Sequence, residues 1–293
     1  MTLSRRSVLA LIGTSLLSAT VRAAQSNAWP KQLRYAIVPN EGDGAQAAYT
    51  RLLRHVEARM GIPVVSYRVS DVTSVIVALT NGQVDAARIG GESYVIARRQ
   101  GDVDAVAMEK THQGTGYLGG LWVRADSGIS SIAMAKGRRL AFSEPNSTSG
   151  YLAPMTYFLD DLKVDPKRFF SEITFAGGAI PAVLALKNRQ VDVAAVSFPY
   201  VGLAVTQGMI RKGELVPVWK SDPIPNPAYV VRGGLPADFR KAYQDALITF
   251  QDPESLAGLP GGVERIVTAS DSDYDYVRQL EHVKQQLDFK ERQ

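Results

Sequence analysis

Apolar positions along the chain follow two different periods. Short continuous apolar runs at residues 33–39 and 64–69 predict buried strands. Residues 46–60 and 72–81 instead carry apolar side chains at helical spacing, and Gly61-Ile62-Pro63 ends the first of these helices. Strands that alternate with amphipathic helices indicate an α/β lobe with a largely parallel sheet.

A helix–turn–strand pattern occurs twice in the chain. Residues 78–87 and 185–194 match at most positions, with Asn at the end of the helix and Val-Asp at the start of a small-residue strand in both copies. Chance is the alternative explanation, because joints of this kind favour the same residue types. We interpret the match as a repeat, which predicts two lobes of like construction.

Each predicted lobe carries a loop directly after its repeated strand, at residues 88–94 and 196–200. Ligands of open α/β sheets bind beyond the carboxyl ends of the strands, and clefts between lobes are favoured binding sites. We therefore expect both loops to line one cleft between the lobes.

The chain is predicted to cross between the lobes twice. Residues 119–124 form a strand that leads out of the first lobe, and the proline-rich passage 219–227 precedes a strand at 228–232 that returns to it. Two crossings make a hinge that can open and close. The resulting division is lobe 1 at 30–123 and 230–293, and lobe 2 at 124–229.

One stretch, residues 142–154, carries the most specific candidate chemistry. Three hydroxyl side chains, Ser147-Thr148-Ser149, are followed by Gly150 and lie between a predicted strand and a predicted helix. One hydroxyl is enough for an ordinary helix N-cap. Three hydroxyls beside the unpaired amides of a helix start also suit a bound anion, which is the second interpretation.

The first 23 residues have the pattern of a secretory signal peptide, with a charged start, a short apolar core and a small-residue end. Arg5-Arg6 is typical of the twin-arginine export signal. Cleavage is expected after Ala23, with Ala24 and Ala28 as alternatives, and the protein is expected in the periplasm. An uncleaved anchor is the other interpretation, although the apolar run is too short for a membrane span.

Removal of this segment changes the charge of the chain. The full chain has a formal charge of +4, from 33 Lys and Arg against 29 Asp and Glu. Loss of Arg5, Arg6 and Arg22 leaves 30 basic against 29 acidic side chains. A nucleic-acid-binding domain would keep a basic surplus, so no nucleic-acid partner is expected. Because the chain has no cysteine, it lacks the residue that carries a lipoprotein anchor, and its fold rests on its core.

Several stretches together resemble the periplasmic phosphonate/phosphite-binding proteins of ABC importers. These stretches are Pro145–Pro154, Gly82–Asp85, Trp219–Ser221 with Ile224-Pro225, and Ser270–Arg278. The resemblance implies an α/β fold of the type II periplasmic binding protein class, with two lobes joined by a two-crossing hinge. It also implies that the three hydroxyls hold the oxygens of a small oxyanion for an ABC permease. We expect a monomer.

The chain also departs from that family. Arg88 lies where relatives often have an aromatic pair, Gly178 where they often have His, and Ser197 where they usually have a carboxylate. The missing acids argue against a ligand that carries an ammonium group. Arg88 either offers a bidentate contact to a second anionic group or is a solvated charge at a strand end.

Two tyrosines complete the candidate set. Tyr94 and Tyr200 are either core aromatics or walls of the ligand site, and Tyr200 is favoured for the site because Pro199 stiffens its loop. The candidate ligand-binding residues are Ser147, Thr148, Ser149, Arg88, Tyr200, Tyr94, Ser197 and Gly178.

Catalysis finds little support in the sequence. His55, His112 and His282 are scattered, the hydroxyl stretch lacks a Gly-x-Ser-x-Gly elbow, and no cluster has metal-ligand spacing. We therefore expect a binding protein without a cofactor. One alternative is a ligand-sensing periplasmic partner of a membrane histidine kinase, and another is a hydrolase that uses Ser149.

Overall fold

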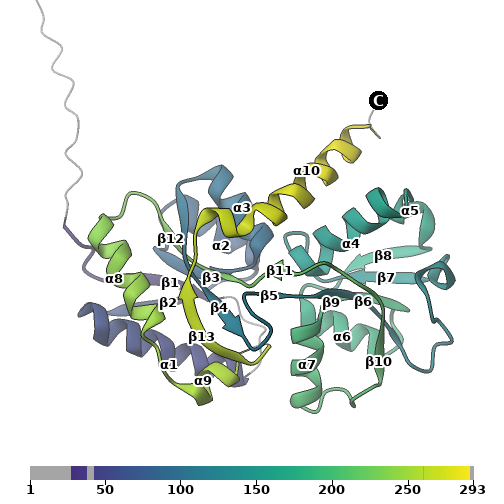
Figure 1. Ribbon diagram of the computed structural model, residues 1–293, viewed down its shortest axis with the longest axis horizontal. Helices are drawn as coiled ribbons and strands as arrows, with labels where there is room; N and C mark the ends of the chain where they lie inside the picture. Colours follow the sequence, from purple (N-terminus) through teal and green to yellow (C-terminus); the bar gives the residue numbers. More distant parts are fainter. Residues whose placement is uncertain (1–27, 38–42, 260, 291–293) are drawn as a thin grey trace, which may run out of the picture.

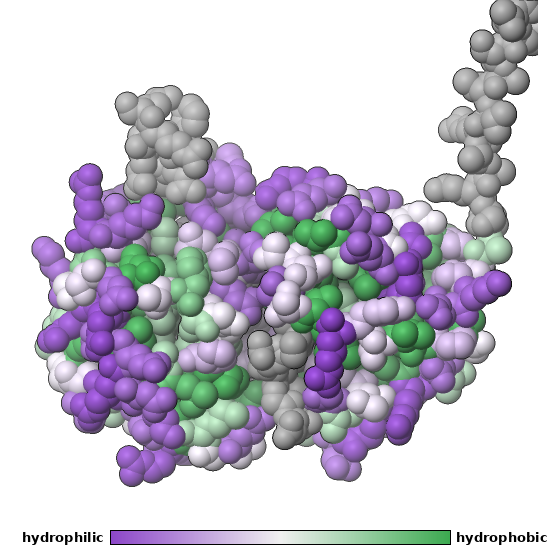
Figure 2. Space-filling model, turned by 180° about the vertical axis from the view of Figure 1, so that it is seen from behind, coloured by the Kyte–Doolittle hydropathy of each residue, from purple (hydrophilic) through white to green (hydrophobic). Residues whose placement is uncertain are grey.

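The computed structural model describes residues 28–37, 43–259 and 261–290, so the predicted signal peptide lies outside the described residues. Two α/β lobes lie side by side, and each is built around its own sheet (Figure 1). Hydrophilic side chains cover much of the face drawn in Figure 2, with smaller apolar patches between them. No helix in the described ranges is long and apolar enough to cross a membrane.

The first lobe contains a six-stranded sheet in the order β13-β4-β12-β3-β1-β2. β1 pairs in parallel with β2 and β3, and β12 is antiparallel between β3 and β4. The apolar side chains of α1, α8 and α9 cover one face of this sheet, and those of α2 and α3 cover the other. The strands are β1 (Leu33–Ile37), β2 (Val64–Arg68), β3 (Ala86–Ile89), β4 (Val103–Thr111), β12 (Ala228–Arg232) and β13 (Val263–Thr268). The helices are α1 (Asp43–Met60), α2 (Val72–Thr80), α3 (Gly91–Gln100), α8 (Ala237–Ile248) and α9 (Pro253–Ala257).

The second lobe contains a five-stranded sheet in the order β10-β6-β9-β7-β8. β7 pairs in parallel with β8 and β9, while β6 and β10 are antiparallel. α6 and α7 cover one face, and the helix formed by η2, α4 and η3 covers the other together with η1 and α5. The strands are β6 (Gly119–Arg124), β7 (Arg139–Phe142), β8 (Glu172–Phe175), β9 (Val193–Ser197) and β10 (Leu215–Lys220). The helices are η1 (Ile132–Ala135), η2 (Thr148–Leu152), α4 (Ala153–Thr156), η3 (Tyr157–Asp161), α5 (Pro166–Phe169), α6 (Ala179–Lys187) and α7 (Phe198–Thr206).

The sequence repeat corresponds to the same structural clasp in both lobes. In lobe 1 the carboxylate of Asp85 accepts hydrogen bonds from the backbone N–H of Arg34 at 2.9 Å and from its guanidinium at 2.7 and 2.9 Å. In lobe 2 Asp192 accepts from the backbone N–H of Arg139 at 3.0 Å and twice from its guanidinium at 3.1 Å. Each clasp joins the turn before the third parallel strand to the first, so the prediction of two lobes of like construction is confirmed.

The lobe boundaries differ from those predicted. The crossings pair as a two-stranded ribbon, β5 (Gly116–Tyr117) with β11 (Ile224–Pro225). β6, predicted to lead out of lobe 1, pairs with β9 and β10 and therefore lies in lobe 2. All of β12, including Ala228 and Tyr229, lies in the first sheet. A strand's own sequence does not say which sheet holds its partners.

The last helix, α10 (Asp275–Lys290), belongs to neither lobe alone. It begins after the short turn η4 (Asp271–Tyr274), packs against α3 of lobe 1, and continues to α4 and η2 of lobe 2 (Figure 1). The assignment of 230–293 to lobe 1 is therefore incomplete. Helix α10 therefore bridges the lobes, in addition to the two crossings.

The two clasps should differ in their contribution to stability. Asp85 is fully buried and also accepts a hydrogen bond from Arg232 at 2.9 Å, whereas the side chain of Asp192 is 20 % exposed. Asp85→Asn removes the buried carboxylate charge that accepts hydrogen bonds from two partly exposed arginines, which should cost about 1.5–3 kcal/mol. Asp192→Asn should cost about 1 kcal/mol, because water screens that pair. Urea denaturation measures both, and equal costs would contradict this interpretation.

Candidate ligand-binding site

A cavity of about 170 Å³ lies between the two lobes. Its wall contains seven of the eight predicted ligand-binding residues, and both lobes contribute to it. The lining residues are Tyr35, Ala36, Ile37, Tyr49, Val72, Arg88, Ile89, Gly90, Ser93, Glu109, Tyr117, Ser143, Glu144, Asn146, Ser147, Thr148, Ser149, Gly178, Ala179, Ser197, Pro199, Tyr200, Asn226 and Pro227.

Five helices begin at this cavity. α2 and α3 contribute lining residues from their first turns in lobe 1, and η2, α6 and α7 do the same in lobe 2. Each of these helices follows the carboxyl end of a parallel strand. A helix start carries unpaired N–H groups and partial positive charge. Their convergence favours a negatively charged ligand.

All three hydroxyls of the Ser147–Ser149 stretch accept a hydrogen bond from the protein. The contacts are Gly150 N to Ser147 Oγ at 3.0 Å, Glu92 N to Thr148 Oγ1 at 2.8 Å, and Tyr117 Oη to Ser149 Oγ at 3.5 Å. In the described part of the chain none of these hydroxyls donates a hydrogen bond in return. Each hydroxyl carries one proton, so the stretch offers three O–H donors at the cavity.

Two other serines on the cavity wall behave differently. Ser93 Oγ donates to the carbonyl oxygen of Asn146 at 3.0 Å, and Ser143 Oγ donates to that of Ala195 at 2.8 Å. Their protons are therefore bound by the protein. Ser147 acts as an N-cap and keeps its proton, so the cap and the anion cradle are compatible interpretations of the same hydroxyl.

Gly150 permits the close packing that holds this helix start in place. A Cβ atom at residue 150 would lie 2.5 Å from Ser143 Cβ and 2.8 Å from Ser147 Oγ. The Gly150 carbonyl also accepts a hydrogen bond from Ser143 N at 3.0 Å. The close neighbour of Gly150 is therefore Ser143, the residue that directly follows strand β7.

Arg88 of β3 lines the cavity, but its guanidinium forms a bidentate ion pair with a carboxylate on β4, on the far side of β12. Its Nε and Nη2 donate to the two carboxylate oxygens of Glu109 at 2.7 and 2.9 Å, and the side chains are only 9 % and 2 % exposed. Glu109 also accepts from the hydroxyl of Tyr229 at 3.2 Å. The interpretation of Arg88 as a solvated charge is therefore wrong, and its contact with a second anionic group stays a prediction.

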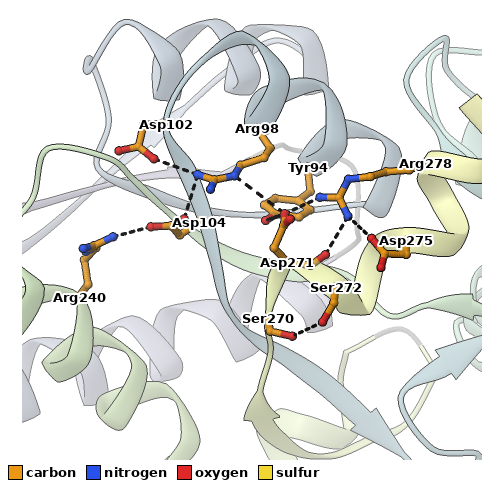
Figure 3. A network of polar contacts seen from close by, with 10 residues as sticks. All are labelled: Tyr94, Arg98, Asp102, Asp104, Arg240, Ser270, Asp271, Ser272, Asp275 and Arg278. Carbon is orange, nitrogen blue, oxygen red and sulfur yellow. Dashed lines mark hydrogen bonds and ion pairs between the residues drawn. The ribbon is translucent and has the colours of Figure 1, made fainter.

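Of the two tyrosines, only Tyr200 lines the cavity, as do Ser197 and Gly178. Tyr94 is fully buried elsewhere, where its hydroxyl donates to Asp271 at 2.5 Å and its ring packs on Tyr274. Figure 3 shows Asp271 between Tyr94 and Arg278, in a polar network that ties α3 to the start of α10. Tyr94 therefore anchors the last helix and does not wall the ligand site.

Glu144 is a lining residue that the sequence interpretation missed, although it directly precedes Pro145 of the motif. Its carboxylate has no hydrogen-bond or ion-pair partner in the described ranges. Burial, and to a lesser extent the charge of Asp71, raise the pKa of Glu144. The cavity wall therefore carries an acid at a position other than those compared with the family, and the argument against an ammonium-bearing ligand stays a prediction.

The duplicated sheet topology and the cavity between the lobes define the class of this protein, a two-lobed binding protein of the type II periplasmic fold. A comparison with family models then identifies the family. The model described as "ABC transporter, phosphonate, periplasmic substrate-binding protein" matches residues 35–274, and the chain belongs to this family.

Characterised relatives are similar over most of the chain. The phosphate-import protein PhnD of Mycolicibacterium smegmatis is 28% identical over 284 residues, which cover 88% of this chain and 88% of the relative. The phosphonates-binding periplasmic protein of Escherichia coli is 28% identical over 258 residues, covering 86% of this chain and 76% of the relative.

Solved structures agree with the fold. The binding-protein component of an ABC phosphonate transporter from Pseudomonas aeruginosa superposes with a TM-score of 0.79 at 25% identity, covering 89% of this chain and 88% of that one. PhnD1 of Prochlorococcus marinus, solved with methylphosphonate, has a TM-score of 0.76 at 18% identity and covers 86% of this chain and 98% of its own.

Replacement of Arg88 tests whether it has a structural role. Arg88→Met leaves the buried charge of Glu109 without its partner and should cost about 3–5 kcal/mol of unfolding free energy. The double variant Arg88→Met with Glu109→Leu leaves no lone charge and should recover much of that loss. Chemical denaturation of both variants gives the comparison, and a single variant as stable as the natural protein would contradict the assignment.

Proposed function

We propose that this protein binds one small tetrahedral oxyanion of the phosphonate, phosphite or phosphate type in the cavity between its lobes, and delivers it to the permease of an ABC importer. The observation that carries the proposal is the set of three O–H donors at Ser147, Thr148 and Ser149, at a point where five helices begin. A tetrahedral oxyanion has several acceptor oxygens on one centre, which suits donors grouped in this way.

The relatives support this ligand class. Their names specify phosphonates in one case and phosphate in another, and methylphosphonate is the ligand of one structural neighbour. The family works with ABC permeases in the periplasm, which supports the permease as partner and export by the predicted signal peptide. Neither the family model nor the named relatives point to a histidine kinase, so that alternative is not supported. We infer that the protein acts as a monomer and has no catalytic step.

The expected hydrogen bonds are sufficient for micromolar affinity for the oxyanion. About four hydrogen bonds to a charged ligand contribute roughly 1.5–3 kcal/mol each. The loss of freedom on association offsets several kcal/mol of that sum. A dissociation constant of 1 μM corresponds to about 8 kcal/mol, which lies within the remaining range.

Calorimetry on the purified protein tests the site with methylphosphonate, phosphite, phosphate and sulfate. Ser147→Ala and Ser149→Ala should each weaken binding of the best ligand by roughly tenfold or more, because each removes one charge-assisted hydrogen bond. The matched control is Ser143→Ala, on the same cavity wall, whose proton already binds the carbonyl oxygen of Ala195 within lobe 2. It should change the affinity by less than about threefold. Absence of heat with every oxyanion would refute the proposal, and full affinity in both hydroxyl variants would move the site elsewhere.

Glu144 should influence which substituent the cavity accepts on the phosphonate. An ionised Glu144 attracts an ammonium group, so Glu144→Gln should lower the affinity for 2-aminoethylphosphonate relative to ethylphosphonate by roughly tenfold. Using the ratio of the two affinities cancels effects on the phosphonate group itself. An unchanged ratio would place Glu144 out of reach of the ligand.

A further inference from the structure

Glu92 lies outside the cavity wall, at the place where lobe 1, lobe 2 and the last helix meet. It is in the first turn of α3 and is 2 % exposed. Its backbone N–H donates to Thr148 Oγ1 of lobe 2 at 2.8 Å. Lys284 of α10 approaches its Oε1 to 4.0 Å, and the same ammonium lies 4.3 Å from the ring centroid of Tyr151 in lobe 2.

The carboxyl group of Glu92 is poorly satisfied in this position. Its Oε2 is buried and has no hydrogen-bond partner in the described ranges. The 4.0 Å separation from Lys284 is longer than a hydrogen bond. Burial of an ionised carboxylate without hydrogen bonds costs much free energy, and burial of the neutral carboxylic acid costs far less.

Three charged groups of α3 and α10 act on Glu92: Lys284, Glu281 and Arg99. Burial raises the pKa of Glu92 to about 8, against the opposing charge of Lys284. Glu281 adds a smaller upward effect, and Arg99, which pairs with Glu281 at 2.7 Å, a smaller downward one. On lobe 2 the Thr148 hydroxyl accepts from the Glu92 N–H, and the Tyr151 ring contacts the Lys284 ammonium. The positive end of α3 also favours the anion, yet burial outweighs it.

Separation of the lobes would change these surroundings. Two further hydrogen bonds cross between the lobes near Glu92. One comes from Ser93, the next residue in the chain, and both involve Asn146, two residues before Thr148. Ser93 Oγ donates to the carbonyl oxygen of Asn146 at 3.0 Å, and Asn146 Nδ2 donates to Thr73 Oγ1 at 2.9 Å. Opening would withdraw Thr148 and Tyr151 from Glu92 and admit water to its carboxyl group.

We propose that closure of the lobes takes up a proton at Glu92, so that the protein holds its ligand more tightly in acidic than in alkaline solution. Glu92 acts on the equilibrium between open and closed lobes and does not touch the ligand. The inference about the closed lobes stands without a ligand. Only its consequence for affinity rests on the proposed function.

The direction of the pH effect on lobe closure depends on the pKa of Glu92 in the open and closed states. The carboxyl group has an ordinary pKa, near 4.3, when solvated, and a higher pKa when the lobes are closed over it. Between these two values the closed state binds more protons than the open or unfolded state. Raising the pH therefore disfavours the closed state across this window, and the effect levels off above about pH 8.

A first experiment needs no ligand. Thermal unfolding is followed from pH 5 to pH 9 for the natural protein, for Glu92→Gln and for Glu254→Gln, a control glutamate that is 88% exposed on α9. The natural protein and the control should lose stability with rising pH relative to Glu92→Gln, which carries no titrating group at this position. Lys284→Met is a second variant, and removal of its cation should raise the pKa of Glu92 in the folded protein and extend the loss of stability to higher pH.

A second experiment measures methylphosphonate affinity by calorimetry at pH 5.5 and 8.5. The dissociation constant of the natural protein divided by that of Glu92→Gln should rise by about tenfold or more from pH 5.5 to pH 8.5. Each unit of difference between the pKa of Glu92 in the open and closed states corresponds to a factor of ten. Ionisation of methylphosphonate affects both proteins equally and cancels in the ratio. A pH-dependent change in the ratio of dissociation constants supports the inference, whereas a difference in thermal unfolding with a constant ratio shows burial of Glu92 without coupling to closure and overturns it.

Parallel pH curves for the natural protein and Glu92→Gln in both experiments would overturn the inference. This result is distinct from failure of the proposed function, which would appear as an absence of binding by every oxyanion whatever residue stands at position 92. If Glu92→Gln does not fold, an unchanged pH curve in Lys284→Met overturns the inference instead.

Discussion

The convergence of helix starts on one cavity is the constraint on which the rest of this structure depends. Parallel strands in each lobe run toward the gap between the lobes, and the helix that follows each of them must begin there. Unpaired amides and partial positive charge therefore collect at the strand ends without any basic side chain. The three hydroxyls at Ser147–Ser149 add protons to this field, and the cavity becomes a site for an anion before any ion pair is considered.

The buried charges fall into two groups that behave differently. The carboxylates of Glu109 and Asp85 are hydrogen-bonded to arginines, so these groups stabilise the first sheet. The carboxyl groups of Glu144 and Glu92 have no hydrogen-bond partner in the described ranges, although Lys284 approaches Glu92 to 4.0 Å, and burial raises the pKa of both. One lies on the cavity wall and the other at the junction of the lobes. The paired charges are therefore part of the scaffold, and the unpaired acids are the groups that can respond to ligand or pH.

The two lobes share one construction plan but are joined asymmetrically. The Asp85 and Asp192 clasps fix equivalent turns in equivalent sheets, so each lobe can move as a unit. The crossings form a short ribbon, and α10 adds a further link that starts from the Tyr94–Asp271 contact in lobe 1 and reaches lobe 2. Closure of the lobes therefore changes the contacts of α10 as well as the cavity. In this way Glu92, which lies outside the ligand site, can influence ligand affinity.

The sequence by itself determined the features that depend on neighbours along the chain. The period of apolar residues, the Val-Asp repeat and the hydroxyl stretch before a helix specify local geometry, and they indicated the α/β lobes and the anion site. Tertiary structure decided which groups meet: Arg88 with Glu109, 21 residues apart, and Tyr94 with Asp271, 177 residues apart. It also decided which sheet β6 joins and which acids stay unpaired. The physical reason is that pairing and desolvation of a charge depend on strands and helices brought together from distant parts of the chain, and no local pattern records them.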